Sequence, residues 1–236
     1  MSIAVRPAEQ RGQTRTDWLE SYHTFSFGDY MDNRYVHFGP LRVINEDFIA
    51  PGQGFGTHPH RDMEIITLLL SGELAHKDSL GNGSVIRPGE VQRMSAGSGI
   101  QHSEFNPSGE NPAHLLQIWI FPDQKGLTPS YEQKTFPPEG ANHQWQLLVS
   151  SDGRDGSVQI HQNAELYYSK LTSGSELTYV CPDERMLWLQ VTRGDLILNP
   201  EVTVRAGDGV GVQQSGELRL KAPDGAEVYL FDLPQS

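Results

Sequence analysis

The stretch GTHPH at residues 56–60 places two histidines two positions apart, and QHSEF at residues 101–105 repeats that spacing with His102 and Glu104. Successive side chains of a β-strand alternate between its faces, so residues two apart point the same way and lie roughly 6.5 Å apart along the strand. The members of each pair could therefore contact one ion. These two stretches predict a metal site built on β-strands.

Short apolar runs recur between glycine, proline and asparagine turns along the whole chain of 236 residues, of which 36% are hydrophobic. None of these runs has sustained helical periodicity, so each is interpreted as a strand. The predicted strands include residues 41–43, 65–70, 84–86, 115–121, 146–149, 187–191 and 228–231. Asn82-Gly83 predicts a hairpin turn before the strand that begins near Ser84. The pattern predicts an all-β protein with sandwich or barrel architecture.

The polar, proline-bearing stretch at residues 129–145 interrupts the rhythm of strands and is interpreted as a linker. It divides the chain into an N-terminal domain, residues 1–128, and a C-terminal domain, residues 146–236. Short repeats support this division. The pairs Gly72-Glu73 and Gly89-Glu90 of the first half correspond to Gly194-Asp195 and Gly207-Asp208 of the second half.

The repeat predicts that only the N-terminal domain binds metal. When the two halves are aligned on these glycines without gaps, the positions of His58, His60 and His102 fall on residues without an imidazole. They are Val180, Pro182 and Leu220. We therefore expect one metal ion per chain.

Charge and composition bound the classes of partner. The formal net charge of −12 argues against direct binding to nucleic acid or to anionic lipid. No apolar run approaches the ~20 residues that span a bilayer, and the first residues lack the apolar core of a signal peptide. The single Cys181 permits no internal disulfide. We expect a cytoplasmic monomer that does not associate with membranes.

The predicted ligand set suits a transition metal with open coordination positions. Neutral imidazoles bind Fe, Zn, Cu and Ni, and a carboxylate adds affinity for harder cations. Three histidines and one carboxylate leave room for a substrate or O2, as in the facial triad of non-haem iron oxygenases. The spacing alone leaves the carboxylate open among Glu64, Glu104 and Asp62, with Glu64 expected on the strand face of His60.

The alternative is that some histidines fall near one another by chance in a chain that has nine of them. Six are interpreted as solvated or hydrogen-bonded surface side chains: His23, His37, His76, His114, His143 and His161. The His58–His60 pair is harder to explain in this way. A proline between the two histidines removes a donor from the strand ladder and favours an edge position, where sites are commonly placed.

The spacing of these residues resembles the two motifs of the cupin superfamily. Gly52, His58, His60 and Glu64 match the first motif, and Gly99, His102 and Asn106 match the second. The match is imperfect, because Gly72 comes one residue late and Gly97 replaces the proline of the second motif. The leading glycine of that motif is displaced to Gly89.

Longer phrases are similar to bacterial members of the pirin family, also described as quercetinases. They are HTFSFGDY at 23–30, FGPLRVINED at 38–47, GFGTHPHRDMEI at 54–65, RPGEVQRMSAGSGIQHSEFN at 87–106 and LLQIWIFP at 115–122. The resemblance implies a bicupin, two tandem β-barrels with metal in the N-terminal one. It also implies a metal set of His58, His60, His102 and Glu104, without Glu64.

From this resemblance and the open ligand set we expect a flavonol 2,3-dioxygenase that opens quercetin-like substrates with O2 and releases carbon monoxide. The expected ion is Fe(II), with Cu, Ni, Co, Mn and Zn as alternatives, and Glu104 is the expected general base. The competing hypothesis is a non-enzymatic metal or redox sensor that acts through a protein partner. A cupin isomerase or decarboxylase that needs no O2 is a third interpretation.

Overall fold

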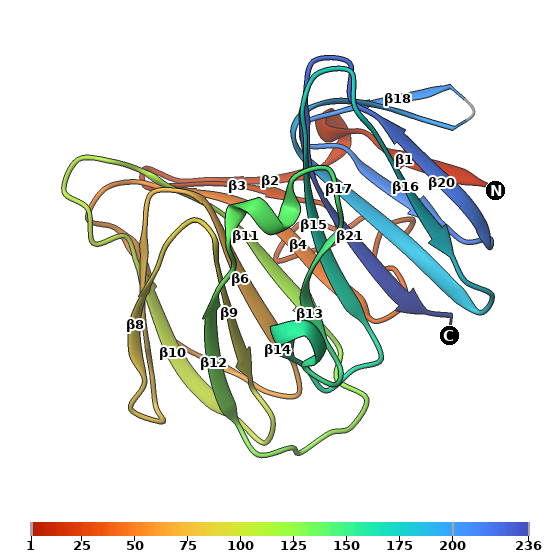
Figure 1. The fold of residues 1–236 in the computed structure, drawn as a ribbon. Coiled ribbons are helices and arrows are strands. Elements are labelled where there is room, and N and C mark those ends of the chain that lie inside the picture. Colours follow the sequence, from red (N-terminus) through yellow and green to blue (C-terminus); the bar gives the residue numbers. More distant parts are fainter. Residues whose placement is uncertain (1, 200, 236) are drawn as a thin grey trace. The chain divides into compact units, whose positions relative to one another are not determined.

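Two compact units divide the chain in the computed structural model, which describes residues 2–199 and 201–235 (Figure 1). The first domain consists of residues 12–136 with 158–162, and the second of residues 1–11, 137–157 and 163–236. Both are built from β-strands, which confirms the predicted all-β class. The boundaries differ from the predicted 1–128 and 146–236, because the first eleven residues belong to the second domain.

The first domain contains a seven-stranded and a four-stranded sheet. The strands of these two sheets are β2 (Gly12–Arg15), β3 (Leu19–His23), β4 (Leu41–Ile49), β5 (Gly54–His60), β6 (Glu64–Ser71), β7 (Leu74–Asp78), β8 (Gly83–Ile86), β9 (Glu90–Ser95), β10 (Ile100–Phe105), β11 (Ala113–Ile120) and β12 (Ser130–Thr135). The short strand β14 (Val158–Gln159) also belongs to this domain but lies outside both sheets. The larger sheet has the order β12-β9-β6-β11-β4-β3-β2, and the smaller one the order β5-β10-β7-β8. All named pairs in both sheets are antiparallel.

The second domain repeats this plan. Its strands are β1 (Ile3–Arg6), β13 (Gln146–Ser150), β15 (Glu165–Leu171), β16 (Glu176–Cys181), β17 (Arg185–Leu198), β18 (Val202–Arg205), β19 (Gly209–Val212), β20 (Gly216–Lys221) and β21 (Ala226–Pro234). One path runs β1-β19-β17-β21-β15-β13, and β20 pairs with both β16 and β17. The long strand β17 takes part in both sheets, since its first half pairs with β21 and its end pairs with β18.

Helices are few and short. The described residues form only three, all of the 3-10 type: η1 (Ala8–Gln10), η2 (Pro138–Ala141) and η3 (Arg154–Gly156). A helix with the length and apolar character needed to cross a membrane is not found in residues 2–199 or 201–235.

The predicted strands and hairpin are confirmed, but the predicted linker is partly a strand. Each of the seven apolar runs lies in a strand, except that β11 ends at Ile120 rather than at Phe121. The Asn82-Gly83 turn joins β7 to β8, which pair with each other. Residues 130–135 form β12, which pairs with β9 of the first domain. A polar edge strand resembles a linker in the sequence, because it has no apolar face that would identify it as a strand.

The glycine repeat corresponds to the same bend in both domains. Gly72 and Gly194 have positive φ angles of 76° and 70°. A Cβ atom on Gly72 would lie 2.5 Å from the Pro112 carbonyl oxygen, and one on Gly194 would lie 2.0 Å from that of Gly225. Only glycine fits a left-handed bend pressed so closely against a neighbouring strand. At this bend the chain passes from the larger sheet to the smaller one.

The ungapped alignment is wrong by one residue in β16. Val180, placed opposite His58 by that alignment, is 65% exposed on the outer face, whereas its neighbours Tyr179 and Cys181 pack with the core. A shift of one residue moves a strand side chain to the other face. Leu220 on β20 is fully buried. The positions that face inward in β16 and β20 are therefore also without histidine, and they are occupied by apolar and aromatic side chains.

Candidate metal centre and its cavity

Strands β5 and β10 place the three predicted histidines on one face of the four-stranded sheet. His58 and His60 are two residues apart on β5, and His102 lies directly opposite His58 in the antiparallel pair. Directly paired residues of neighbouring strands project to the same side of a sheet. The local spacing and this register together bring the three side chains to one point.

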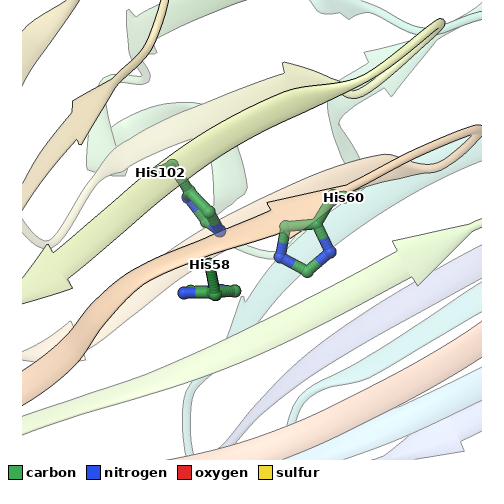
Figure 2. Close-up of side chains that lie close together, drawn as sticks. All are labelled: His58, His60 and His102. Carbon is green, nitrogen blue, oxygen red and sulfur yellow. The ribbon is translucent and has the colours of Figure 1, made fainter.

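The three imidazoles form a compact group, shown in Figure 2. Their potential ligand atoms all lie within 4.8 Å of one another, and their ring centroids are 4.4–4.8 Å apart. His58 Nδ1 lies 2.8 Å from the carbonyl oxygen of Gly56, to which it donates, and this leaves Nε2 as the free ligand atom. Neither ring nitrogen of the buried His102 has a hydrogen-bond partner among the described residues.

The surroundings keep two of these imidazoles neutral. Burial and the neighbouring His58 lower the pKa of His60 to about 4. Burial, reinforced by the other histidines, also lowers the pKa of His102. Because a metal binds the unprotonated nitrogen, both side chains are ready for coordination at neutral pH. Unpartnered buried nitrogens that converge on one point are the arrangement expected of a metal site.

Glu104 lies two residues after His102 on β10 and is 3% exposed. Its two carboxyl oxygens accept hydrogen bonds from Gln117 Nε2 at 2.9 and 3.0 Å. The hydroxyl of Thr67 in turn donates to Gln117 Oε1 at 3.0 Å. Burial raises the pKa of the Glu104 carboxyl to about 7, against the opposing effect of the Gln117 hydrogen bond. Glu104 can therefore exchange a proton near neutral pH.

No carboxylate of the described residues, Glu104 included, belongs to the group formed by the three imidazoles, and the other two candidates are hydrogen-bonded elsewhere. Glu64 begins β6 and does not share a strand with His60, because a turn through Asp62, with φ of 48°, intervenes. The expectation of a shared face is therefore wrong. Glu64 accepts a hydrogen bond from Ser95 at 2.8 Å, and Asp62 accepts one from the backbone of Gly126. Of the three candidates, only Glu104 lines the cavity described next.

A cavity of about 410 Å³ opens beside the imidazole group. His58, His60 and Glu104 form part of its wall, and the rings of Phe27, Phe55 and Trp119 contribute apolar surface. The Trp119 ring packs edge-on against His60 with centroids 4.9 Å apart, and Phe27 packs against Trp119 at 5.4 Å. The volume and the aromatic lining suit a flat small molecule. Polar side chains from β2, β3 and β4 complete the wall: Thr14, Ser21, His23, Asn45 and Asp47.

Two of the six remaining histidines differ from the expected surface role. His23 is hydrogen-bonded as expected, but it is 1% exposed and lines the cavity. His76 is 3% exposed, and neither of its ring nitrogens has a partner within the described part of the chain. Its ring stacks on Tyr131 and lies 5.3 Å from the His102 ring. The other four make the expected side-chain hydrogen bonds: His37, His114, His143 and His161.

The sequence interpretation missed the polar residues inside the first domain. The signal was present, because Ser21 and His23 on β3 and Asn45 and Asp47 on β4 each keep the two-residue spacing of one strand face. Polar residues on alternate positions usually mark the solvent face of a strand. These four are 1–4% exposed, so here the polar face is the inner one.

Comparisons with known proteins match the whole chain. The family model described as Pirin matches residues 4–120, and the one described as quercetinase C-terminal cupin domain matches residues 147–233. A protein of Escherichia coli K12 named quercetin 2,3-dioxygenase is 46% identical over 232 residues, which cover 98% of this chain and 99% of that one.

Solved structures agree with these matches. The crystal structure of YhhW from Escherichia coli has a TM-score of 0.96 and 45% identity, and the match covers 100% of this chain and 99% of that one. A structure of the bacterial pirin YhhW from Escherichia coli in complex with nickel(II) has a TM-score of 0.94 and the same identity, with both chains fully covered. The predicted bicupin fold is thereby confirmed.

Proposed function

The chain belongs to the pirin family of cupin proteins, and from that premise we propose that it is a metal-dependent quercetin 2,3-dioxygenase. In this proposal the enzyme is an oxidoreductase that opens the central ring of a flavonol with O2 and releases carbon monoxide. The observation that carries the proposal is a group of three converging imidazoles, two of which, His58 and His60, lie on the wall of an aromatic-lined cavity. The names of the relatives favour this enzyme over the competing sensor hypothesis.

The residues present fit a divalent transition metal. The orphaned, buried nitrogens of His102 and the lowered pKa values of His60 and His102 are what such an ion requires. We propose His58, His60 and His102 as ligands, with Glu104 completing the set. The nickel complex of the similar bacterial pirin supports a divalent ion, and Fe(II) remains our specific proposal.

When bound, the metal supplies a Lewis acid that lowers the pKa of the 3-hydroxyl of the flavonol. Glu104 accepts the proton of that hydroxyl. A carboxyl with a pKa near 7 is better matched to this transfer than an ordinary glutamate, because its proton affinity lies closer to that of the group it deprotonates. Gln117 holds both carboxyl oxygens and orients them.

The cavity wall positions the substrate and excludes water. Phe27, Phe55 and Trp119 offer ring surfaces for the flat flavonol, and Trp119 is fixed against His60. A site that excludes water also strengthens the electrostatic interaction between Glu104 and the substrate hydroxyl. Two of the proposed ligands, the proposed base and the apolar surface therefore line one cavity of the first domain.

The direct test is an assay of the protein loaded with Fe(II), Cu, Ni, Co, Mn or Zn, with quercetin under O2. We expect bleaching of quercetin and release of carbon monoxide with at least one ion, and neither with metal-free protein. Absence of metal-dependent bleaching with all six ions would refute the proposal. Elemental analysis of protein purified without chelator is expected to find one ion per chain. The cytoplasmic location and the monomeric state remain predictions from the sequence.

A further inference from the structure

The polar wall of the cavity, formed by Thr14, Ser21, His23, Asn45 and Asp47, has no role in the proposed metal chemistry. The register of the sheet builds it, because Ser21 lies directly opposite Asp47, and His23 lies opposite Asn45. Both pairs join β3 and β4, which belong to the seven-stranded sheet. The metal ligands lie on the other sheet of the same domain.

The hydrogen bonds within the polar wall assign the orientation of its groups. His23 Nδ1 donates to Asn45 Oδ1 at 2.8 Å, since an amide oxygen can only accept. His23 Nε2 is then the acceptor for the Thr14 hydroxyl at 2.9 Å. The Ser21 hydroxyl donates to Asp47 Oδ1. Each of these side chains fixes its neighbour in one orientation.

Two polar groups of this wall have no hydrogen-bond partner among the described residues. Within the described residues, the Asn45 amide donates to no acceptor, and Asp47 Oδ2 accepts from no donor. Both atoms are accessible to solvent, and both residues line the cavity. Burial raises the pKa of Asp47 to about 7, against the opposing effect of its hydrogen bond with Ser21.

Because both atoms are open to the cavity, a ligand can replace solvent on them. Apolar residues at these two positions would offer a ligand no polar partner. The equivalent interior of the second domain is apolar. A free N–H donor two residues from a free carboxyl acceptor, on one strand face, matches a hydroxyl group, which accepts through its oxygen and donates through its hydrogen.

We propose that Asn45 and Asp47 form a subsite for phenolic hydroxyl groups of the substrate that are remote from its metal-binding end, and that this subsite selects polyhydroxylated flavonols. The inference rests on the proposed function. In it the Asn45 amide donates to the phenolic oxygen, and the phenolic hydrogen is donated to Asp47 Oδ2. His23, Thr14 and Ser21 are positioning residues, because their hydrogen bonds hold Asn45 and Asp47 in place.

Binding of two flavonols tests the subsite separately from turnover. Quercetin carries hydroxyls on both outer rings, whereas 3-hydroxyflavone keeps only the hydroxyl expected at the metal. Titration calorimetry of metal-loaded protein under nitrogen is expected to show at least ~10-fold tighter binding of quercetin, the ratio typical of one hydrogen bond to a buried polar site. Asp47→Asn replaces the free acceptor with a donor and should remove most of that preference, with binding of 3-hydroxyflavone unchanged.

Glu110→Gln is the matched control, because it also replaces a carboxylate with an amide, at an exposed position of the same domain. It should leave both affinities unchanged. Asn45→Ala is the second variant and should weaken quercetin alone. Unfolding temperatures of all variants show whether each is folded.

The outcomes separate the two proposals. A preference for quercetin that is lost in Asp47→Asn, together with no metal-dependent turnover of quercetin, would support the subsite and refute the dioxygenase. Equal affinities for the two flavonols in the unmodified protein would overturn the subsite, whatever the turnover. Equal weakening of both ligands in Asp47→Asn and Asn45→Ala would also overturn it, and so would failure of either flavonol to bind.

Discussion

The interiors of the two domains differ far more than their strand plans. In the first domain a row of buried polar residues crosses five neighbouring strands of the larger sheet, each directly paired with the next: His23, Asn45, Gln117, Thr67 and Gln92. In the second domain the core cluster consists mostly of leucine, valine and alanine side chains, and Ser169 and Asp232 are also buried. The same architecture therefore supports a row of polar side chains inside one copy and a mainly hydrophobic core in the other.

The difference shows what each interior contributes. Apolar burial stabilises a domain, at roughly 25 cal/mol per Å² removed from water, whereas buried polar groups contribute little net stability. The second domain therefore has the interior of a stable scaffold. The first domain has less of that stabilisation, because polar side chains occupy part of its interior. The predictions below test this contrast.

The largest effect is expected for His102→Ala. Loss of a direct ligand should reduce metal affinity by more than the roughly 10–100-fold that loss of an outer hydrogen-bond partner costs. Elemental analysis should find little metal, and quercetin turnover should disappear. His37→Ala, which removes an exposed imidazole of the same domain, is the control and should keep one ion per chain. Full metal content in His102→Ala would remove this histidine from the site.

Glu104→Gln should separate binding from chemistry. The amide cannot accept the substrate proton, so we expect kcat to fall by about 10²–10⁴-fold, the usual contribution of a general base. Because the three imidazoles remain, the variant should retain most of its metal. Steady-state kinetics and metal analysis on the same sample check this. Unchanged kcat would show that Glu104 is not the base.

Leu220→Ala tests the scaffold role of the second domain. Leu220 is fully buried in the apolar cluster, so its truncation should cost about 2–5 kcal/mol of unfolding free energy. Denaturant unfolding measures this cost. Below the unfolding transition, metal content and kcat should be unchanged. A loss of metal without a loss of stability would contradict the division of roles between the two interiors.

The smallest effect concerns the pH dependence of stability through Asp47. Burial raises its pKa from 3.8 to about 7 in the folded protein. Between these values the folded state holds a proton that the unfolded state has released, so the carboxyl makes folding less favourable as pH rises towards 7. Asp47→Asn has no such proton.

Thermal unfolding of metal-free protein at pH 5 and pH 8 measures this difference. The unfolding temperature of Asp47→Asn relative to the unmodified protein should rise by at least roughly 2–4 °C between the two pH values, the shift that about 1 kcal/mol gives in a chain of this size. Glu110→Gln, at an exposed position of the same domain, is the control. A relative fall on going to pH 8 would show that the Asp47 pKa is not raised.

Several features of the site were predictable because they depend on short-range geometry. The two-residue spacing on β5 and β10 was enough to place His58 and His60 on one face and to pair His102 with Glu104. Where a turn or a shift of one residue intervened, the same reasoning failed. It placed Glu64 on the strand of His60, and it aligned Val180 with an inward position although this residue is exposed.

Strand periodicity and glycine bends are properties of neighbouring residues, so the all-β class, the two-domain plan and the choice of the three histidines as candidate ligands could be predicted from the sequence. The tertiary structure shows that Glu104 lines the cavity and that the polar faces of β3 and β4 point inward. Both depend on the register between strands far apart in the sequence, such as Ser21 with Asp47 and Asn45 with Gln117. Alternation of side chains along one strand shows that the strand has two different faces. Its pairing with neighbouring strands determines which face is buried.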